Sequence, residues 1–294
     1  MMNPVTAPSG DRLLLIWRTE FLFYTPERRQ LAQEWNHVRL TSAELPETPT
    51  LINHRLDGPL PLENESFDAV YCFHTIEHLN PNAGKRFIND TRRLLKPGGV
   101  LRVSTPDLEF HSRDYLDRLK EQIESPSREN YARYHWAVCN LIDQSAREVS
   151  GGAMLQAIRD REYNAEHLKQ INGDLLHFLF PPTPSDSFSG GAASKPSFSL
   201  ATALLALPRK IGRKLLGLFQ CAPTQSYLEL SHERNLWMYD RVSLGGILSG
   251  CGFRDVTPLT YRTSQIPDWQ RYNFDQSAFG DYPLEPSLYI EGIK

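Results

Sequence analysis

Cysteine and net charge are both scarce in this sequence, and each scarcity excludes a class of protein. The 294 residues contain four cysteines without a C-x-x-C pair: Cys72, Cys139, Cys221 and Cys251. That pattern indicates neither a disulfide framework nor a cysteine-based zinc site. The 32 basic and 35 acidic residues give a net charge of −3. A dedicated nucleic-acid binder would usually carry a basic excess, so we expect no nucleic acid among the partners.

Long hydrophobic runs are also absent from the sequence. No apolar run reaches the ~18–20 residues of a membrane span, and the N-terminal stretch M-M-N-P-V-T-A-P-S-G-D-R is too polar for a secretory signal. We therefore expect a cytoplasmic protein with reduced thiols. The remaining composition, 40% hydrophobic and 11% aromatic, is that of a globular chain able to bury a sizeable core.

Short apolar runs alternate with helical patterns along the chain. The run F-D-A-V-Y-C-F at 67–73 predicts a buried strand, and a helical pattern follows over 83–95 until Lys96-Pro97-Gly98-Gly99 ends it. The next strand is expected at 100–104, so strand, helix and strand form a βαβ unit. This unit predicts an α/β fold with a doubly wound, mostly parallel sheet. Further strands are expected at 13–17, 37–41, 50–54, near 256 and at 287–293, with helices over 131–149 and after Asp240.

The chain divides into a core that is interrupted by an insertion. We expect the first part of the core at 1–155, the insertion at 156–228 and the C-terminal part of the core at 229–294. The insertion contains a Pro/Gly/Ser-rich linker and then a basic amphipathic segment, 200–219. This segment either contacts an anionic membrane surface or a protein partner, or covers the core of the protein itself.

Two stretches carry a resemblance to a known family. P-L-E-N-E-S-F-D-A-V-Y-C-F-H-T-I-E-H-L and R-R-L-L-K-P-G-G-V-L-R-V-S-T-P-D-L-E resemble the middle of a class I S-adenosylmethionine-dependent methyltransferase. The nearest group is type 11, found among sugar and polysaccharide biosynthesis proteins. The resemblance continues over 140–154 and 236–253. It implies a Rossmann-like fold, S-adenosylmethionine as cofactor, and O-methylation of a sugar, glycan or related small-molecule hydroxyl.

The cofactor region departs from the pattern of that family. Gly10 is the only glycine before Gly58, so the glycine-rich loop after the first strand is missing, and Thr41-Ser42 stands where an acidic residue would bind ribose. These departures motivate a second hypothesis, a non-catalytic scaffold or regulatory subunit in a glycan-assembly complex. On the first hypothesis, the resemblance implies that the cofactor contacts Trp17, Asp57, Gly58, Phe73 and His74.

His74, Glu77 and His78 form H-x-x-E-H directly after the strand at 67–73. If this segment is helical, the spacing places the three side chains so that they could hold a divalent metal, which gives a third hypothesis of metal-dependent or cofactor-independent chemistry. The alternative is a structural signature in which His78 hydrogen-bonds a loop. His74 is the candidate general base, because it lies at the carboxyl end of a central strand.

Other polar residues have a functional and a structural interpretation. Asp107 either takes part in catalysis at the substrate pocket or caps the following helix. Asp143, Gln144 and Arg147 either line the acceptor pocket or include an i,i+4 ion pair on a surface helix. The aromatic and charged residues near the C-terminal part of the core either stack on a sugar ring or pack in the interior; they are Trp237, Tyr239 and Arg241.

Overall fold

The computed structural model describes residues 13–17, 37–41, 51–53, 58–149, 151–160, 162–163, 165–174, 234–272, 274–277 and 280–294. Asp57, the linker and the segment 200–219 lie outside these residues, as do the residues between the first two strands. Within the described part, no helix is long and apolar enough to cross a membrane.

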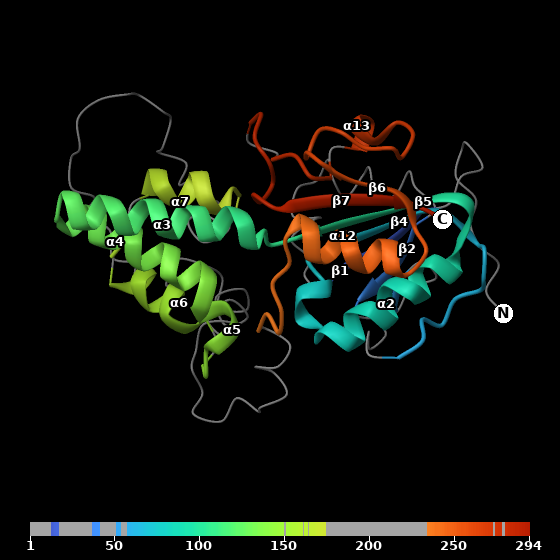
Figure 1. The fold of residues 1–294 in the computed structure, drawn as a ribbon, viewed down its shortest axis with the longest axis horizontal. Helices are drawn as coiled ribbons and strands as arrows, with labels where there is room; N and C mark the ends of the chain where they lie inside the picture. The colour runs from blue at the N-terminus through green and yellow to red at the C-terminus, as the bar shows by residue number, and fades with distance from the viewer. Residues whose placement is uncertain are drawn as a thin grey trace, which may run out of the picture.

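A seven-stranded sheet forms the centre of the molecule, in the order β3-β2-β1-β4-β5-β7-β6 (Figure 1). The first five strands along the chain are parallel, and β7 is antiparallel to both β5 and β6. The strands are β1 (Leu13–Trp17), β2 (His37–Thr41), β3 (Leu51–Asn53), β4 (Phe67–Phe73), β5 (Leu95–Thr105), β6 (Arg254–Leu259) and β7 (Leu288–Ile293). This sheet confirms the predicted Rossmann-like α/β fold of mostly parallel strands.

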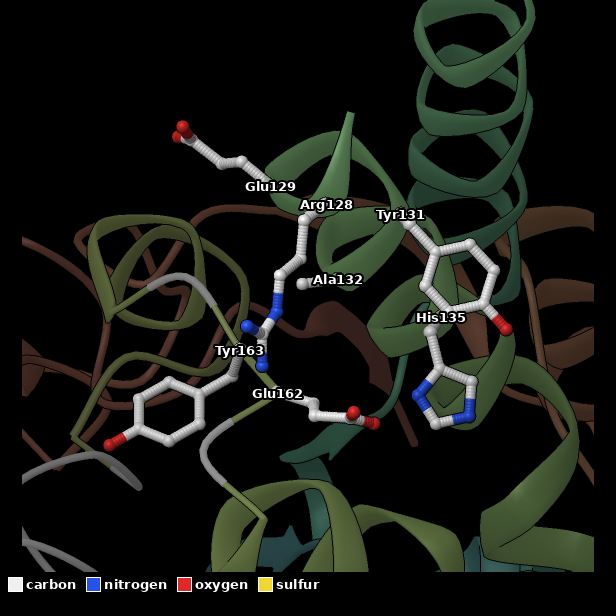
Figure 2. A pocket seen from close by; sticks show the side chains of 7 residues that line it. All are labelled: Arg128, Glu129, Tyr131, Ala132, His135, Glu162 and Tyr163. Carbon is white, nitrogen blue, oxygen red and sulfur yellow. The ribbon is translucent and has the colours of Figure 1, made fainter. Parts of the chain in front are cut away.

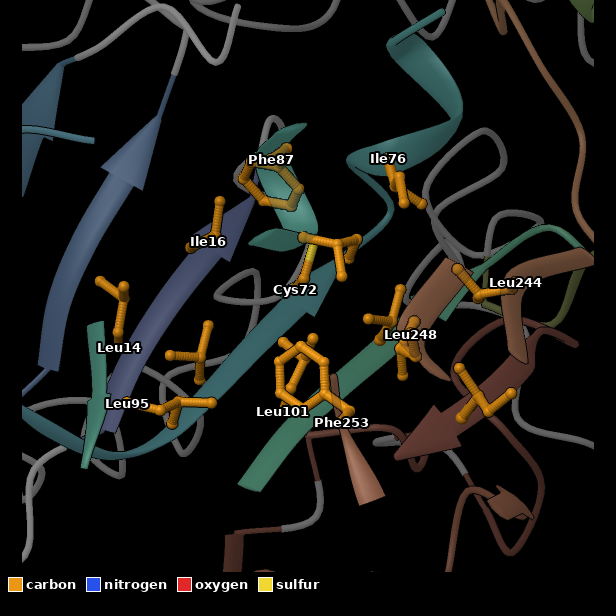
Figure 3. Close-up of a cluster of buried hydrophobic side chains, with 14 of the residues drawn as sticks. Leu14, Ile16, Cys72, Ile76, Phe87, Leu95, Leu101, Leu244, Leu248 and Phe253 are labelled. Carbon is orange, nitrogen blue, oxygen red and sulfur yellow. The ribbon is translucent and has the colours of Figure 1, made fainter. Parts of the chain in front are cut away.

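Among the described residues, two helices cover one face of the sheet, α2 (Pro81–Leu94) and α12 (Arg241–Gly250). Pro81 occupies the first turn of α2, and the Asn80 side chain accepts a hydrogen bond from the Ala83 N–H at 3.0 Å, which fixes the start of the helix. Figure 3 shows the apolar layer between these helices and the sheet. Its members are buried residues of both helices and of alternate strand positions, including Leu14, Ile16, Cys72, Phe87, Leu101, Leu244 and Leu248.

The opposite face of the sheet is covered by the segment that contains α13 (Trp269–Tyr272). Because side chains alternate along a strand, Leu13 and Leu15 of β1 point to this face, where they cluster with Tyr71 and Phe274. Arg102 of β5 lies in the same layer and is fully buried. Its guanidinium forms ion pairs with Asp275 and Glu291, each at 2.6 Å, and lies 4.8 Å from the centre of the Trp269 ring.

A helical lobe extends from the end of β5 away from the sheet (Figure 1). The lobe begins with α3 (Leu108–Glu124) and continues with α4 (Arg128–Val138), a π-helical turn (Cys139–Asp143) and α5 (Gln144–Ala146). The predicted helix over 131–149 therefore exists, but it starts earlier, contains a π turn and ends before Arg147. α6 (Gly152–Arg159) and α7 (Ala165–Asn172) follow. A buried cluster that includes Trp136, Met154 and Leu168 joins these helices.

Candidate functional site

The carboxyl ends of β1, β4 and β5 lie next to one another, and we call this line the carboxyl edge. Trp17 pairs with Phe73, and Phe73 pairs with Ser104, so the three strands reach the edge together. Doubly wound α/β sheets bind their ligands outside the carboxyl ends of their strands. The residues that follow β4 and β5 therefore form the candidate site.

His74 is the first residue after β4, and its backbone has an unusual conformation. Its φ angle is +40°, in the left-handed region that is uncommon for a residue other than glycine. The His74 N–H donates to the Ser104 carbonyl at 2.9 Å, which holds the turn in place. The helical turn η2 (Ile76–His78) starts two residues later. His74 therefore lies outside the helix, so the condition under which the spacing of His74, Glu77 and His78 could hold a metal is not met.

The imidazole of His74 has a defined hydrogen-bonding arrangement. Its Nε2 lies 2.8 Å from the Ser287 Oγ, and the Ser287 hydroxyl donates to the Glu285 carbonyl at 2.9 Å. With the hydroxyl proton used in that way, the assigned tautomer of His74 carries its proton on Nε2, which donates to Ser287. Nδ1 then carries the lone pair of the neutral ring. It lies 3.4 Å from Glu77 Oε1 and 3.7 Å from Glu285 Oε2.

The two carboxyl groups beside His74 are themselves perturbed. Glu77 is 1% exposed and accepts a hydrogen bond from the Thr105 hydroxyl at 3.0 Å, while burial raises the pKa of its carboxyl. Burial also raises the pKa of Glu285 to about 7. The Glu285 side chain retains 26% exposure, and solvent therefore moderates this effect. Burial lowers the pKa of His74. We call His74, Glu77, Thr105, Glu285 and Ser287 the His74 cluster.

Glu285 and Ser287 were missed by sequence reasoning, because only the strand pairing in the structure brings them to the site. Thr105 at the end of β5 pairs with Leu288 at the start of the antiparallel strand β7. The residues just before β7 must therefore lie at the carboxyl edge, and the polar pair in Glu285-Pro286-Ser287 occupies that place. His111 of α3 was also missed. It is buried, its Nδ1 has no hydrogen-bond partner among the described residues, and burial lowers its pKa to about 4.

The described residues do not support a divalent metal at His74, Glu77 and His78. They contain no group of three or more histidine, cysteine or acidic side chains arranged to hold a metal ion. His78 Nδ1 lies 2.9 Å from the Arg234 carbonyl oxygen, and the other nitrogen is 3.9 Å from Glu77. The His78 ring therefore hydrogen-bonds the chain at Arg234, which confirms the structural alternative.

Asp107 follows β5 at the same edge and caps α3. Its side chain accepts a hydrogen bond from the Glu109 N–H at 2.9 Å, so the capping interpretation is confirmed. Burial raises the pKa of its carboxyl. A catalytic role for Asp107 stays a prediction.

The predicted pair of Asp143 and Arg147 exists, but it is not on an exposed surface. The two side chains lie 3.3 Å apart and are only 12% and 9% exposed. The Asp143 carboxylate also accepts hydrogen bonds from the backbone N–H groups of Ala153 and Met154, at 2.7 and 3.3 Å, at the start of α6. Gln144 accepts a hydrogen bond from Asn235 at 2.9 Å.

The three residues expected to stack on a sugar are placed differently from one another. Tyr239 is fully buried in the core between α2 and α12, as the packing alternative states. Trp237 is 48% exposed, and its backbone N–H donates to the Glu77 carbonyl at 3.0 Å, which places the residue beside the His74 cluster. Arg241 is half exposed and forms an ion pair with Glu109 at 2.9 Å.

The residues expected to contact the cofactor are only partly described. Phe73 is buried at the end of β4, and its ring lies 4.5 Å from that of His74. The backbone of Trp17 ends β1 beside it, and Gly58 is exposed. In the part of the chain that the structure describes, the ion pairs of Glu77 and Glu285 are to histidines rather than to lysine or arginine.

Comparisons with known proteins point to a methyltransferase. Residues 26–103 match the family described as a methyltransferase domain. A probable S-adenosylmethionine-dependent methyltransferase of Mycolicibacterium smegmatis is 45% identical over 56 residues, which are 19% of this chain and 21% of that protein. The chain thus spans about a fifth of the length of this relative. Both matches support an enzyme of the class I S-adenosylmethionine-dependent methyltransferase type.

Solved structures are similar only at a low level. A SAM-dependent methyltransferase from Archaeoglobus fulgidus aligns with 97% of this chain and 87% of its own, at 11% identity and a TM-score of 0.38. One from Mesorhizobium loti aligns with 36% of this chain and 50% of its own, at 20% identity and a TM-score of 0.27. Scores this low carry no argument, so the fold assignment rests on the sheet described above.

Proposed function

We propose that this protein transfers a methyl group from S-adenosylmethionine to a hydroxyl group of a sugar or glycan. One observation carries the proposal: the imidazole of His74 lies between two carboxyl groups at the carboxyl edge. This edge is the place where folds of this type bind their ligands. The match to a methyltransferase domain covers residues 26–103, which include His74. The acceptor class is supported by the resemblance to type 11 methyltransferases of sugar and polysaccharide biosynthesis.

His74 has the geometry of a general base. The tautomer set by Ser287 leaves Nδ1 free to take the proton of an acceptor hydroxyl. The resulting imidazolium would be stabilised by Glu77 and Glu285, whose carboxylates face the same nitrogen. Proton transfer to a positioned histidine contributes about 10²–10⁴-fold to a rate.

The other contribution of the protein to methyl transfer is to position the acceptor. When bound, S-adenosylmethionine supplies an activated methyl group on its sulfonium, so the protein has mainly to align the acceptor oxygen with it. The left-handed turn at His74 is held by the hydrogen bond to Ser104, and it fixes the base relative to the strand end. The backbone N–H of Trp237 donates to the Glu77 carbonyl, and the exposed indole ring would lie next to the acceptor.

Transfer of a labelled methyl group tests the proposal. The full chain is incubated with methyl-labelled S-adenosylmethionine and a panel of sugars and oligosaccharides, and label is measured in the recovered saccharide. We expect transfer by the wild type and a kcat at least about 10²-fold lower for His74→Gln. Transfer to no saccharide would exclude the acceptor class, and equal kcat values would exclude His74 as the base.

The non-catalytic scaffold is the alternative outcome of this experiment. A folded protein that binds neither S-adenosylmethionine nor its demethylated product would favour that role over the enzyme.

A further inference from the structure

His111 is a buried histidine that the proposed proton transfer does not use. It lies in the first turn of α3, where its backbone N–H donates to the Asp107 carbonyl at 3.0 Å. The residue is 5% exposed, and Nδ1 of its ring has no hydrogen-bond partner among the described residues. A buried polar atom without a partner costs about 1–3 kcal/mol. A hydrogen bond from a bound molecule would remove this cost.

The start of α3 is fixed at the carboxyl edge. Asp107 forms a parallel β-bridge with Tyr239, and the Leu108 N–H donates to the Tyr239 carbonyl at 2.8 Å. Thr105 of the His74 cluster ends β5 shortly before Asp107. His111 therefore lies one helical turn beyond the residue that joins α3 to the edge, on the side of the sheet where ligands bind in such folds.

The rings of His74 and His111 influence each other electrostatically. Burial, and to a smaller extent the charge of His74, lowers the pKa of His111 to about 4. Because a Coulombic effect weakens with distance, this influence indicates that the two rings lie near each other. His111 is therefore neutral at pH 7, and a neutral imidazole has one donor and one acceptor nitrogen. A hydroxyl group both donates and accepts, so it can bind Nδ1 in either tautomer.

We propose that His111 is a specificity-determining residue for the acceptor, whose Nδ1 hydrogen-bonds a second hydroxyl of the sugar while the hydroxyl to be methylated faces His74. One hydrogen bond fixes a single oxygen, whereas two bonds to one sugar ring also fix the orientation of the ring. The protein therefore selects acceptors that carry a hydroxyl near the methylated one. This inference rests on the proposed function, since it concerns the same acceptor.

Methyl transfer to sugars and to their deoxy analogues tests the inference. The full chain is incubated with methyl-labelled S-adenosylmethionine and the methyl glycosides of glucose, mannose and galactose, each also as monodeoxy derivatives, and kcat/KM is measured. For the wild type we expect at least one analogue that keeps the methylated hydroxyl to react at least about tenfold less efficiently than its parent sugar. A site that hydrogen-bonds a hydroxyl discriminates against an analogue that lacks it.

Replacement of His111 shows whether this residue causes the discrimination. His111→Leu removes the hydrogen bond, so it should lower kcat/KM for the parent sugar at least about tenfold and accept the parent and the analogue alike within about twofold. His111→Gln keeps a donor and an acceptor at different positions. Its discrimination should fall at least about threefold below that of the wild type, and it provides the comparison if the leucine variant does not fold.

His135→Leu is the matched control. His135 lies on α4 and lines a cleft that contains no residue of the His74 cluster (Figure 2). This variant should keep both the kcat/KM and the discrimination of the wild type.

The outcomes separate this inference from the proposed function. Transfer to none of the sugars rejects the proposed acceptor class and the inference together. Transfer without discrimination against any analogue, or discrimination that a folded His111 variant keeps in full, rejects the role of His111 alone. A merely structural histidine would give this last result, because its loss would lower kcat/KM for the parent and the analogue by the same factor.

Discussion

At the scale of single residues, the sequence predicts the central histidine of the site but not its partners. His74 is recognisable because it directly follows a legible strand, and Glu77 because it lies three residues further on. Glu285 and Ser287 are more than 200 residues away along the chain, and only the antiparallel pairing of β5 with β7 brings them to His74. Local patterns carry no information on such a pairing, so these partners require the structure.

The raised pKa of Glu285 gives a prediction about pH and stability. The pKa of this carboxyl is 4.5 when unperturbed and about 7 in the folded protein, so the folded state binds more protons than the unfolded state between these values. Stability from this group is therefore present at low pH and lost as pH rises from 4.5 to 7. With allowance for partial exposure, we expect a loss of about 1–2 kcal/mol.

Urea unfolding of the wild type and Glu285→Gln at pH 5 and pH 7 measures this effect. Because the glutamine does not titrate, the wild type should lose stability relative to the variant between the two pH values. A difference between the proteins that is constant with pH would show that Glu285 has an ordinary pKa.

At the scale of helices and strands, the sequence predicts the bounds of a strand well where a dense apolar run marks it. The strands at 13–17, 37–41 and 67–73 match the structure in full. The first and the third are mostly apolar runs, as expected for parallel strands that are buried on both faces. The π turn within the helix after Arg128 was not predicted, since it depends on tertiary packing of Cys139 and Asn140 rather than on helix propensity.

The start of α6 shows a glycine that the fold requires. Gly152 has a φ of +53°, and a Cβ at this position would overlap the Asp143 carboxylate that binds the N–H groups of α6. We expect Gly152→Ala to destabilise the protein by about 1–3 kcal/mol in thermal or urea unfolding.

Gly246→Ala is the matched control for this substitution. Gly246 lies inside α12 with no atom within 4 Å of a built Cβ, and alanine there should stabilise the protein by about 0.5–1 kcal/mol. Equal stability of the two variants would contradict the backbone strain and the steric overlap that we infer for a side chain at Gly152.

At the scale of the whole molecule, buried charges connect distant parts of the chain. Arg102 in β5 joins Glu291 of β7 and Asp275 beyond α13, and it donates to the carbonyls of Thr260 and Thr263 at 3.0 Å. Removal of the guanidinium would leave two buried carboxylates without their cation. We expect Arg102→Met to cost about 3–5 kcal/mol of unfolding free energy.

Arg113→Met provides the comparison at the surface. Arg113 also pairs with a carboxylate, at 2.7 Å from Glu109, but its side chain is 74% exposed, so its loss should cost less than about 1 kcal/mol. Similar losses in chemical unfolding for the two variants would refute the structural role of the Arg102 network.

The measurement that tests the central claim most directly is a calorimetric titration of the full chain with S-adenosylmethionine and S-adenosylhomocysteine. The account predicts micromolar binding of both, since residues 26–103 match a methyltransferase domain. It also predicts that added divalent metal changes neither affinity, because the described residues hold no metal site. A folded protein that binds neither compound up to millimolar concentrations would contradict the account.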